Sequence, residues 1–219
     1  MVSKVEAAKR LLTLQEAGES FGAFCRLHHP SWKVPMFHHK LIEALDRLEK
    51  GTLLSDFNEE WAVIEHNHNN RHTPELQKTY TRPLTTHTLH NVMINMPPRH
   101  SKSSYATQLF PSYYLARNPT RFSMTASYNS QLATDFGRQQ RLYLQHEETE
   151  MVFPDFALAK DSRAQDVFRT TEGGAAFNIG MGATTSGRPA TLLSIDDPIK
   201  SRKEADSATQ RQKAWDYYT

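Results

Sequence analysis

The sequence predicts an α/β domain with a mainly parallel sheet and helices on both of its faces. Two observations carry this prediction. From residue 89 onward, short apolar runs suited to buried strands alternate with longer segments whose apolar residues recur every three or four positions, as in helices. Such alternation is typical of parallel sheets covered by helices. The chain has 219 residues, which is enough for one such domain.

Each element is expected from its own local pattern. Helices are predicted over residues 4–17 and from about 35 to 50, where Gly51 supplies a stop signal. A strand is predicted at Asn91–Asn95, followed by a Pro-rich turn. The remaining predictions are helices over 102–116 and 130–144 and strands over 121–126, 175–179 and 190–195. The chain is thus divided into an N-terminal helical part (1–54), a polar insertion (55–88) and a core (89–219).

Composition fits a soluble globular protein. Hydrophobic residues make up 38% of the chain, and no apolar stretch approaches the roughly 18 residues of a membrane span. The N-terminus lacks a signal-peptide core, so a cytoplasmic protein without a membrane partner is expected. The net charge is only +2, so any contact with nucleic acid requires a local basic patch or a partner domain. The single cysteine, Cys25, excludes an intrachain disulfide and is expected to be a small buried residue.

The polar insertion is rich in His and Asn and is predicted to contain one short strand, at 61–64. Its histidines His66, His68 and His72 suggest a metal site. No cysteine and no H-E-x-x-H run accompanies them, so a solvated loop is favoured.

A phosphate site is predicted in VMINMPPRHSKSSYA, residues 92–106. The P-loop pattern G-x-x-x-x-G-K-[ST] directs backbone N–H groups at a helix start towards phosphates. Lys102 and Ser103 match its K-[ST] end, whereas Met96 and Ser101 occupy the two glycine positions. Lys102 would reach the β- and γ-phosphates, and Ser103 would bind Mg²⁺. The alternative is a serine at a helix N-cap followed by an exposed lysine.

Neighbouring residues complete the expected ATP-binding set, which is Arg99, His100, Ser101, Lys102, Ser103 and Ser104. Arg99 stands inside the loop, where its guanidinium could reach γ-phosphate oxygens or hold an acidic group.

A second motif, ATLLSIDDP at residues 190–198, has the Walker B form of an apolar strand that ends in acids. Asp196 would hold Mg²⁺, and Asp197 would orient the attacking water at a position more often occupied by Glu. The alternative is that both acids cap a following helix with Pro198 early in it. The order of the two motifs, with room for an α/β unit between them, predicts ATP hydrolysis.

The chain resembles the ATPase domain of the large terminase subunit of tailed bacteriophages. The resemblance is carried by HHPSWKVPMFHHKLIEALDRLEKG, NVMINMPPRHSKS, RFSMTASYNSQLATDFGRQQR and GGAAFNIGMGATTSGRPATLLSIDDPIKSRKEADSATQRQKAWDYY. It implies a P-loop NTPase fold of the ASCE (RecA-like) type with Walker A and Walker B motifs. It also implies a molecular motor, a hydrolase that uses ATP and Mg²⁺ to package double-stranded DNA into a procapsid. The implied partners are the portal protein, the procapsid, the small terminase subunit and further copies in a homo-oligomeric ring, in the host cytoplasm. The isolated domain can be a monomer.

The resemblance also implies residue roles. Asp197 is the implied catalytic carboxylate, Arg99 the P-loop arginine, and Arg188 the arginine that enters a neighbouring subunit's site. Arg138 and Arg141 are rivals for that last role, and the plainer interpretation of all three is a solvated surface arginine.

Adenine is expected to pack against the segment HHPSWKVPMFHH, residues 28–39, which is rich in proline and aromatic residues and leads into the second helix. Trp32, Phe37 and His38 are the candidates, because they combine rings that stack with a polar edge that reads the base. The alternative is that Trp32 and Phe37 belong to the core.

Two features of the family are not found before Thr219. The coupling motif on the strand after Walker B and the nuclease acids would both lie beyond it, so nuclease activity is not expected here. Two alternatives stay open, a helicase-like DNA-dependent ATPase and a non-catalytic oligomerisation or DNA-binding module with a degenerate P-loop. The missing glycines favour the second of these.

Overall fold

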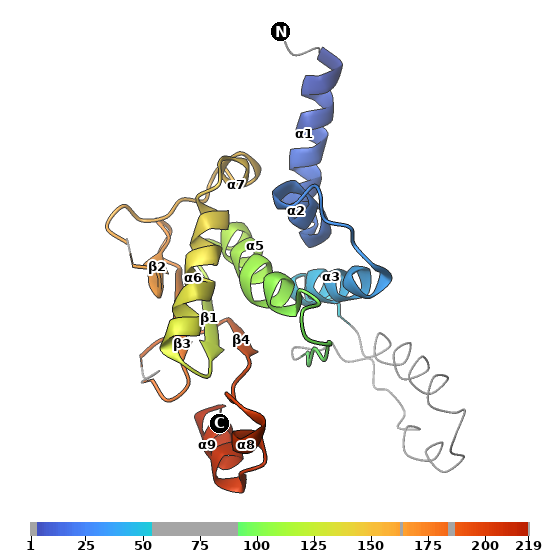
Figure 1. The fold of residues 1–219 in the computed structure, drawn as a ribbon. Coiled ribbons are helices and arrows are strands. Elements are labelled where there is room, and N and C mark those ends of the chain that lie inside the picture. Colours follow the sequence, from blue (N-terminus) through green and yellow to red (C-terminus); the bar gives the residue numbers. More distant parts are fainter. Residues whose placement is uncertain (1–3, 54–91, 163, 184–186, 219) are drawn as a thin grey trace, which may run out of the picture. The chain divides into compact units, whose positions relative to one another are not determined.

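The computed structural model describes residues 4–53, 92–162, 164–183 and 187–218 (Figure 1). The chain forms two compact units, Met1–Lys33 with Met96–Thr219, and Val34–Asn95. The helical residues up to Lys33 belong to the unit that holds the sheet. The expected insertion, with its short strand and its three histidines, lies outside the described residues.

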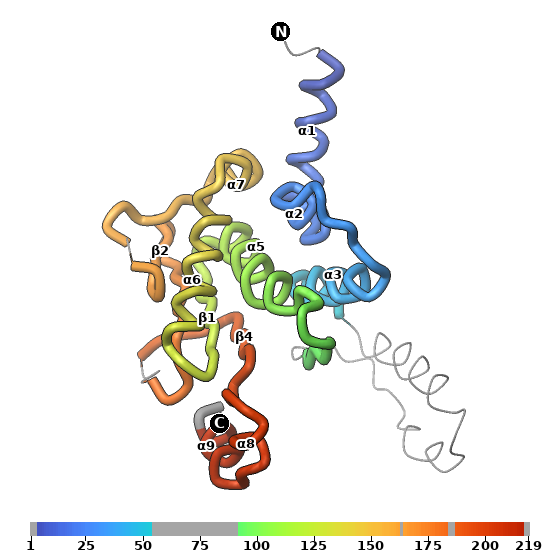
Figure 2. The backbone as a smooth tube through the Cα atoms, viewed as in Figure 1, coloured from blue at the N-terminus to red at the C-terminus, as the bar shows by residue number. Residues whose placement is uncertain are grey.

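Most predicted elements are confirmed within one to three residues. The first unit contains the helices α1 (Lys4–Glu19), α2 (Phe21–His28), η2 (Ser104–Leu109), α5 (Phe110–Arg117), α6 (Ser130–Leu144), α7 (Glu147–Val152), α8 (Arg202–Ala205) and α9 (Ala208–Tyr218). Its strands are β1 (Phe122–Ser127), β2 (Val167–Arg169), β3 (Ala175–Gly180) and β4 (Leu192–Asp196). The chain leaves β4 and continues through residues 197–201 into α8 and α9, as the red end of Figure 2 shows.

The four strands form one mixed sheet in the order β2-β3-β1-β4. β1 pairs in parallel with β3 and β4, whereas β2 pairs with β3 antiparallel. In the register, Ser127 lies opposite Gly180 on one side and Asp196 on the other. The carboxyl ends of the three parallel strands therefore meet at one edge of the sheet, where ligands bind in open α/β sheets.

One face of the sheet packs against α5, α6 and η2. A Cβ atom on Gly137 of α6 would lie 2.1 Å from the Gln165 carbonyl oxygen and 2.7 Å from Asn178 Nδ2, so this helix approaches closely. The opposite face carries a buried apolar cluster of Met124, Ala126, Ala175, Phe177 and Ile179. In the described part of the chain no helix contributes to that cluster, so helices on both faces, as predicted, are not observed there.

Helix α2 packs against the rest of the first unit through aromatic side chains. Phe21 lies with its ring centroid 5.3 Å from that of Phe110, and Phe24 lies 5.4 Å from Tyr113. Both phenylalanines are fully buried. Cys25 is also buried, as predicted, and the buried surroundings raise the pKa of its thiol.

The second unit contains α3 (Met36–Glu49), whose Ala44 packs with Leu53 and Leu48. Residues 92–95 are irregular, so the strand predicted at Asn91–Asn95 is wrong for the residues that are described. An apolar run becomes a strand only when another strand pairs with its N–H and C=O groups, and the described sheet does not include it. Among the described helices, none is both long and apolar enough to cross a membrane.

Candidate phosphate and carboxylate site

The predicted phosphate turn has an unusual backbone. Arg99 has φ of 64° and Ser101 has φ of 57°, both in the left-handed region, and Lys102 begins the helix. Ser101 stands where the P-loop pattern places glycine, the residue that adopts this conformation without strain. A left-handed residue followed by a right-handed one directs successive N–H groups to the same side, which suits an anion. The turn therefore has a left-handed residue at the position where the pattern places glycine.

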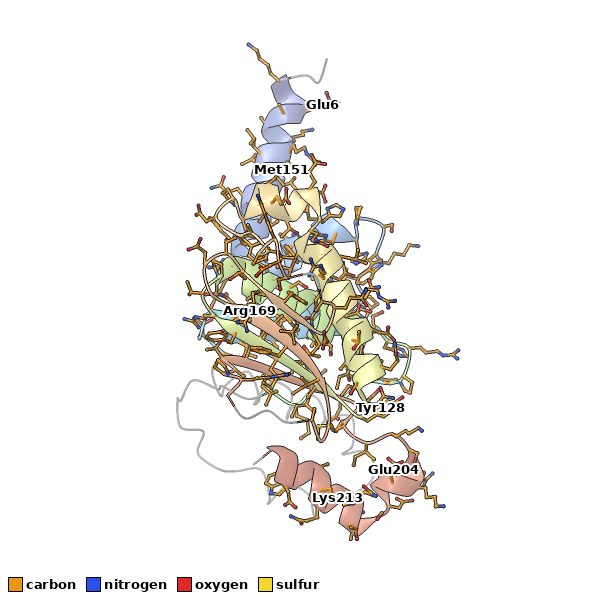
Figure 3. All side chains as sticks on the ribbon, turned by 90° about the vertical axis from the view of Figure 1, so that its left-hand side faces the viewer. Glu6, Tyr128, Met151, Arg169, Glu204 and Lys213 are labelled. Atoms are coloured by element: carbon orange, nitrogen blue, oxygen red, sulfur yellow. The ribbon has the colours of Figure 1, made fainter. Side chains whose placement is uncertain are left out.

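The carboxylates Asp196 and Asp197 lie at the carboxyl edge of the sheet. Asp196 ends β4 and is 3% exposed, whereas the Asp197 side chain is 65% exposed. Asp197 also has a left-handed backbone, with φ of 47°. Its carbonyl oxygen accepts a hydrogen bond from the N–H of Tyr128, which Figure 3 shows just beyond β1. The chain turn after β4 is thus fixed to the neighbouring strand.

The interpretation of these acids as helix caps is wrong. The next helix, α8, begins at Arg202, and its N-cap is Ser201, whose hydroxyl accepts from Glu204 N–H. Pro198 lies in irregular backbone before this helix.

Lys102 brings the two motifs together. Its Nζ lies 2.8 Å from Asp196 Oδ1 and 3.4 Å from Asp197 Oδ1. Burial acts to lower the pKa of Lys102, but the hydrogen bond and the charge of Asp196, with the charge of Asp197, outweigh it and raise the pKa. The lysine is therefore a charged, ion-paired residue and not the freely exposed one of the alternative interpretation. Two carboxylates against one ammonium leave a negative charge at the sheet edge.

Left-handed non-glycine residues occur in the same two motifs. In the described part of the chain, the only non-glycine residues with positive φ are Arg99, Ser101 and Asp197. Each left-handed residue costs about 1–2 kcal/mol, and such costs persist mostly where function requires them. The left-handed residues and the ion pairs of Lys102 thus lie in the same two segments, the phosphate turn and the end of β4.

The residues present fit a Mg²⁺ ion. Mg²⁺ prefers oxygen ligands and uses one or two carboxylates together with water and phosphate oxygens. Asp196 offers a buried carboxylate, and Ser103 lies one residue beyond Lys102, with no side-chain capping bond. Over the described residues no cluster of three or more His, Cys, Asp or Glu is found. A magnesium site of this kind does not need such a cluster.

The other predicted nucleotide contacts are distributed between the units. His100 is exposed, and its Nδ1 lies 2.8 Å from the Pro98 carbonyl oxygen. Trp32 stacks on His29 with ring centroids 3.8 Å apart and meets the edge of Tyr105, in the helix after the turn. Phe37 and His38 belong to the second unit, where Phe37 is exposed and His38 is buried.

The three candidate arginines lie elsewhere on the first unit. Arg188 is exposed, and its Cζ lies 5.6 Å from the centre of the Phe177 ring. Arg141 donates to the carbonyl oxygens of Ser162 and Ala164, so it fastens a loop. Arg138 donates to Gln165 Oε1 at 3.2 Å. The engagement of Arg141 leaves it poorly suited to reach a second subunit, whereas Arg188 is on the surface.

Two residues near the site were not predicted. Thr107 donates from Oγ1 to Asp196 Oδ2 at 3.1 Å, and Gln140 donates to the carbonyl oxygen of Thr107 at 2.7 Å. Pro111, inside the predicted helix 102–116, is the one signal in the sequence that pointed to irregular hydrogen bonding there.

Comparison of the chain with family models, with curated proteins and with solved structures finds no match. The site is therefore interpreted from its own geometry and from the motifs.

Proposed function

We propose that this chain is a Mg²⁺-dependent ATPase with a P-loop NTPase fold. The observation that carries the proposal is the meeting of Lys102 with Asp196 and Asp197, at 2.8 and 3.4 Å. A helix-start lysine after a left-handed turn and two acids at the end of a parallel strand are the parts that phosphoryl transfer to water requires. The strained residues lie in the same two segments.

In this proposal Lys102 exchanges partners. Without nucleotide its ammonium pairs with both carboxylates, and with nucleotide it moves to the phosphates. Asp196, with Ser103, would then be free to hold Mg²⁺, and the ion would neutralise charge on the phosphates. Asp197 is exposed enough to reach water, and it orients the molecule that attacks the γ-phosphorus. The new P–O bond forms in line with the bond that breaks, giving ADP and phosphate.

We further propose the role of a terminase large-subunit motor domain, which acts on double-stranded DNA with a portal, a procapsid and a small subunit. The support for this part is the set of motif segments given above. A helicase-like ATPase is the alternative, and the two differ in their partners. Stimulation of hydrolysis by procapsids that carry a portal supports packaging, whereas strand separation independent of capsids supports the alternative.

The first test is the substitution Lys102→Ala. We expect ATP turnover to fall at least about a hundredfold, because the substitution removes the phosphate-binding charge. Lys160→Ala serves as a matched control, since this lysine is exposed and lies outside both motifs. Wild-type turnover by a folded K102A protein, with folding checked by circular dichroism, would refute the site. Failure of the wild type to bind an ATP analogue with Mg²⁺ would favour the non-catalytic module.

A further inference from the structure

The helix after the phosphate turn is irregular at one point. Residues Ser104–Leu109 form a π-helical segment, η2, and the chain returns to an α-helix at Phe110. Pro111 lies at the start of that α-helix. Proline has no N–H group, so it donates neither to the carbonyl four residues back, Thr107, nor to the one five residues back, Ala106. In a regular α-helix a proline ring also crowds the carbonyl four residues back, and the wider π-helical segment ends two residues before Pro111.

Both carbonyl groups left without this donor receive side-chain donors. Gln140 of α6 donates from Nε2 to the Thr107 carbonyl oxygen at 2.7 Å, and Ser194 of β4 donates to that of Ala106 at 3.3 Å. Gln140 is 1% exposed and also donates to Thr125 Oγ1 on β1, at 3.0 Å. The π-helical segment is therefore fixed to α6, to β4 and, through Gln140, to β1.

Thr107 connects the π-helical segment to the candidate site through its hydrogen bond to Asp196. The two oxygens of the Asp196 carboxylate have different partners, since Oδ1 faces Lys102 Nζ at 2.8 Å and Oδ2 accepts from Thr107 Oγ1 at 3.1 Å. Lys102 is half-buried on a flexible stem, and it has to leave Asp196 when it binds phosphate. Thr107 is 1% exposed and its backbone is held by Gln140, so it stays.

We propose that Thr107 is a positioning residue that keeps the Asp196 carboxylate in one orientation while Lys102 transfers to a nucleotide. Oδ2 stays on the threonine hydroxyl, and Oδ1, once the lysine has left it, would be free to hold Mg²⁺. This inference rests on the proposed ATPase function. It assigns the orienting hydroxyl to Thr107, one helical turn beyond the Ser103 of the motif.

The test compares Thr107→Val with Thr107→Ser. Valine keeps the shape and removes the donor, whereas serine keeps the donor. Calorimetry with a non-hydrolysable ATP analogue gives its affinity in EDTA and across a Mg²⁺ titration. We expect T107V to need about 10–100 times more Mg²⁺, the usual effect of losing a residue that orients a metal ligand. Affinity in EDTA should stay within about twofold of wild type, and T107S should resemble wild type.

A control separates positioning from a general loss of stability. Thr149 is also fully buried, and its hydroxyl donates to the Tyr143 carbonyl and meets His28, outside the two motifs. Thr149→Val should lower the melting temperature and leave the Mg²⁺ requirement unchanged. If T107V does not fold, Thr107→Ala removes the same hydroxyl without placing a methyl group beside the carboxylate.

The outcomes are distinct. A wild-type Mg²⁺ requirement in folded T107V or T107A, with analogue still bound, overturns the inference and leaves the ATPase proposal intact. A wild type that binds no analogue refutes the ATPase proposal and this inference together. Equal Mg²⁺ shifts in T107V and T149V would show that the effect is one of stability, and would also overturn the inference.

Discussion

At the residue scale, the phosphate turn has Ser101 in a left-handed backbone conformation that glycine adopts without strain. Ser101, with φ of 57°, has a strained backbone next to Lys102. The side chain at this position is exposed, so packing does not require serine there. The strain is therefore a property of the turn itself and can be relieved by a single substitution.

Ser101→Gly should stabilise the protein by about 1 kcal/mol, because glycine adopts the left-handed region without a Cβ clash. Ser104→Gly, three residues on in helical backbone, should instead destabilise it by about 0.5–1 kcal/mol. Urea denaturation measures both. Equal destabilisation by the two substitutions would contradict the left-handed backbone at Ser101. Because glycine is the residue of the P-loop pattern, S101G should keep ATP turnover.

The sequence predicts Lys102, Asp196 and Asp197 because each belongs to a motif that names the residue by its position. It does not predict Thr107 or Gln140. Pro111 signals an irregularity in this helix, but it does not show which side chains the π-helical segment brings to Asp196 or which side of α6 faces η2. The residues proposed to contact the nucleotide are thus easier to predict from the sequence than the residues that fix their orientation.

At the element scale, α6 and β3 approach more closely than side chains normally permit, and Gly137 makes the approach possible. Gly137→Ala should destabilise the protein by about 1–3 kcal/mol, since its Cβ would overlap the Gln165 carbonyl and the Asn178 amide. Gly18→Ala is the control, because its nearest neighbour, Val152 Cγ1, lies at an ordinary 3.6 Å. That substitution should be neutral or mildly stabilising in thermal denaturation. A tolerated G137A would mean that α6 lies further from β3.

The contact of α2 with α6 and α7 should depend on pH. His28 Nε2 lies 3.0 Å from Thr149 Oγ1, and His29 Nε2 lies 2.8 Å from Tyr143 Oη. Burial, with the nearby charges of His146 and His29, lowers the pKa of His28 from 6.5 to about 4, and burial also lowers that of His29. Below pH 6.5 these two histidines therefore bind protons more readily in the unfolded chain than in the folded chain.

Stability should accordingly be greatest above pH 6.5 and decline as the pH falls from 6.5 towards 4. His28→Gln, which keeps a polar group and removes this titration, should flatten the decline. Melting temperatures at several pH values measure it, with His100→Gln as an exposed control. The groups that face His28 include His146, which itself lies 3.7 Å from Glu148. An equal decline in wild type and H28Q would assign the pH dependence to other groups.

The elements themselves were predictable where a local pattern sufficed. The strands β1, β3 and β4 are apolar runs, and α6 has a clear helical repeat, so all four were expected. β2 has only three residues, Val167–Arg169, and exists because β3 pairs with it, which no local pattern shows. The apolar run at 91–95 predicts a strand, but its described residues are irregular because apolarity alone does not supply a strand to pair with.

At the scale of the whole molecule, the site as described has Lys102 and two carboxylates but no arginine at the lysine. Among the residues that the structure describes, neither Asp196 nor Asp197 forms an ion pair with Arg99, Arg138, Arg141 or Arg188. If the chain works in a ring, a neighbouring copy can supply the missing charge. Arg188 is the candidate to test, because it is exposed and lies four residues before β4, the strand that ends at Asp196.

A mixing experiment tests this assembly. Lys102→Ala removes the phosphate lysine and keeps Arg188, while Arg188→Ala does the opposite. Each variant alone should be nearly inactive, since an arginine supplied in trans contributes a factor of about 10³–10⁵ to turnover. Mixed at concentrations where the wild type assembles, they should recover activity, because an intact site of the R188A copy can receive the arginine of the K102A copy. Arg138→Ala, mixed in the same way, controls for loss of a surface charge.

Wild-type turnover by R188A alone, or a mixture no more active than its parts, would show that the arginine does not cross between subunits. Turnover of the wild type that rises more steeply than its concentration would be the independent sign that the ATPase is completed only by a second copy.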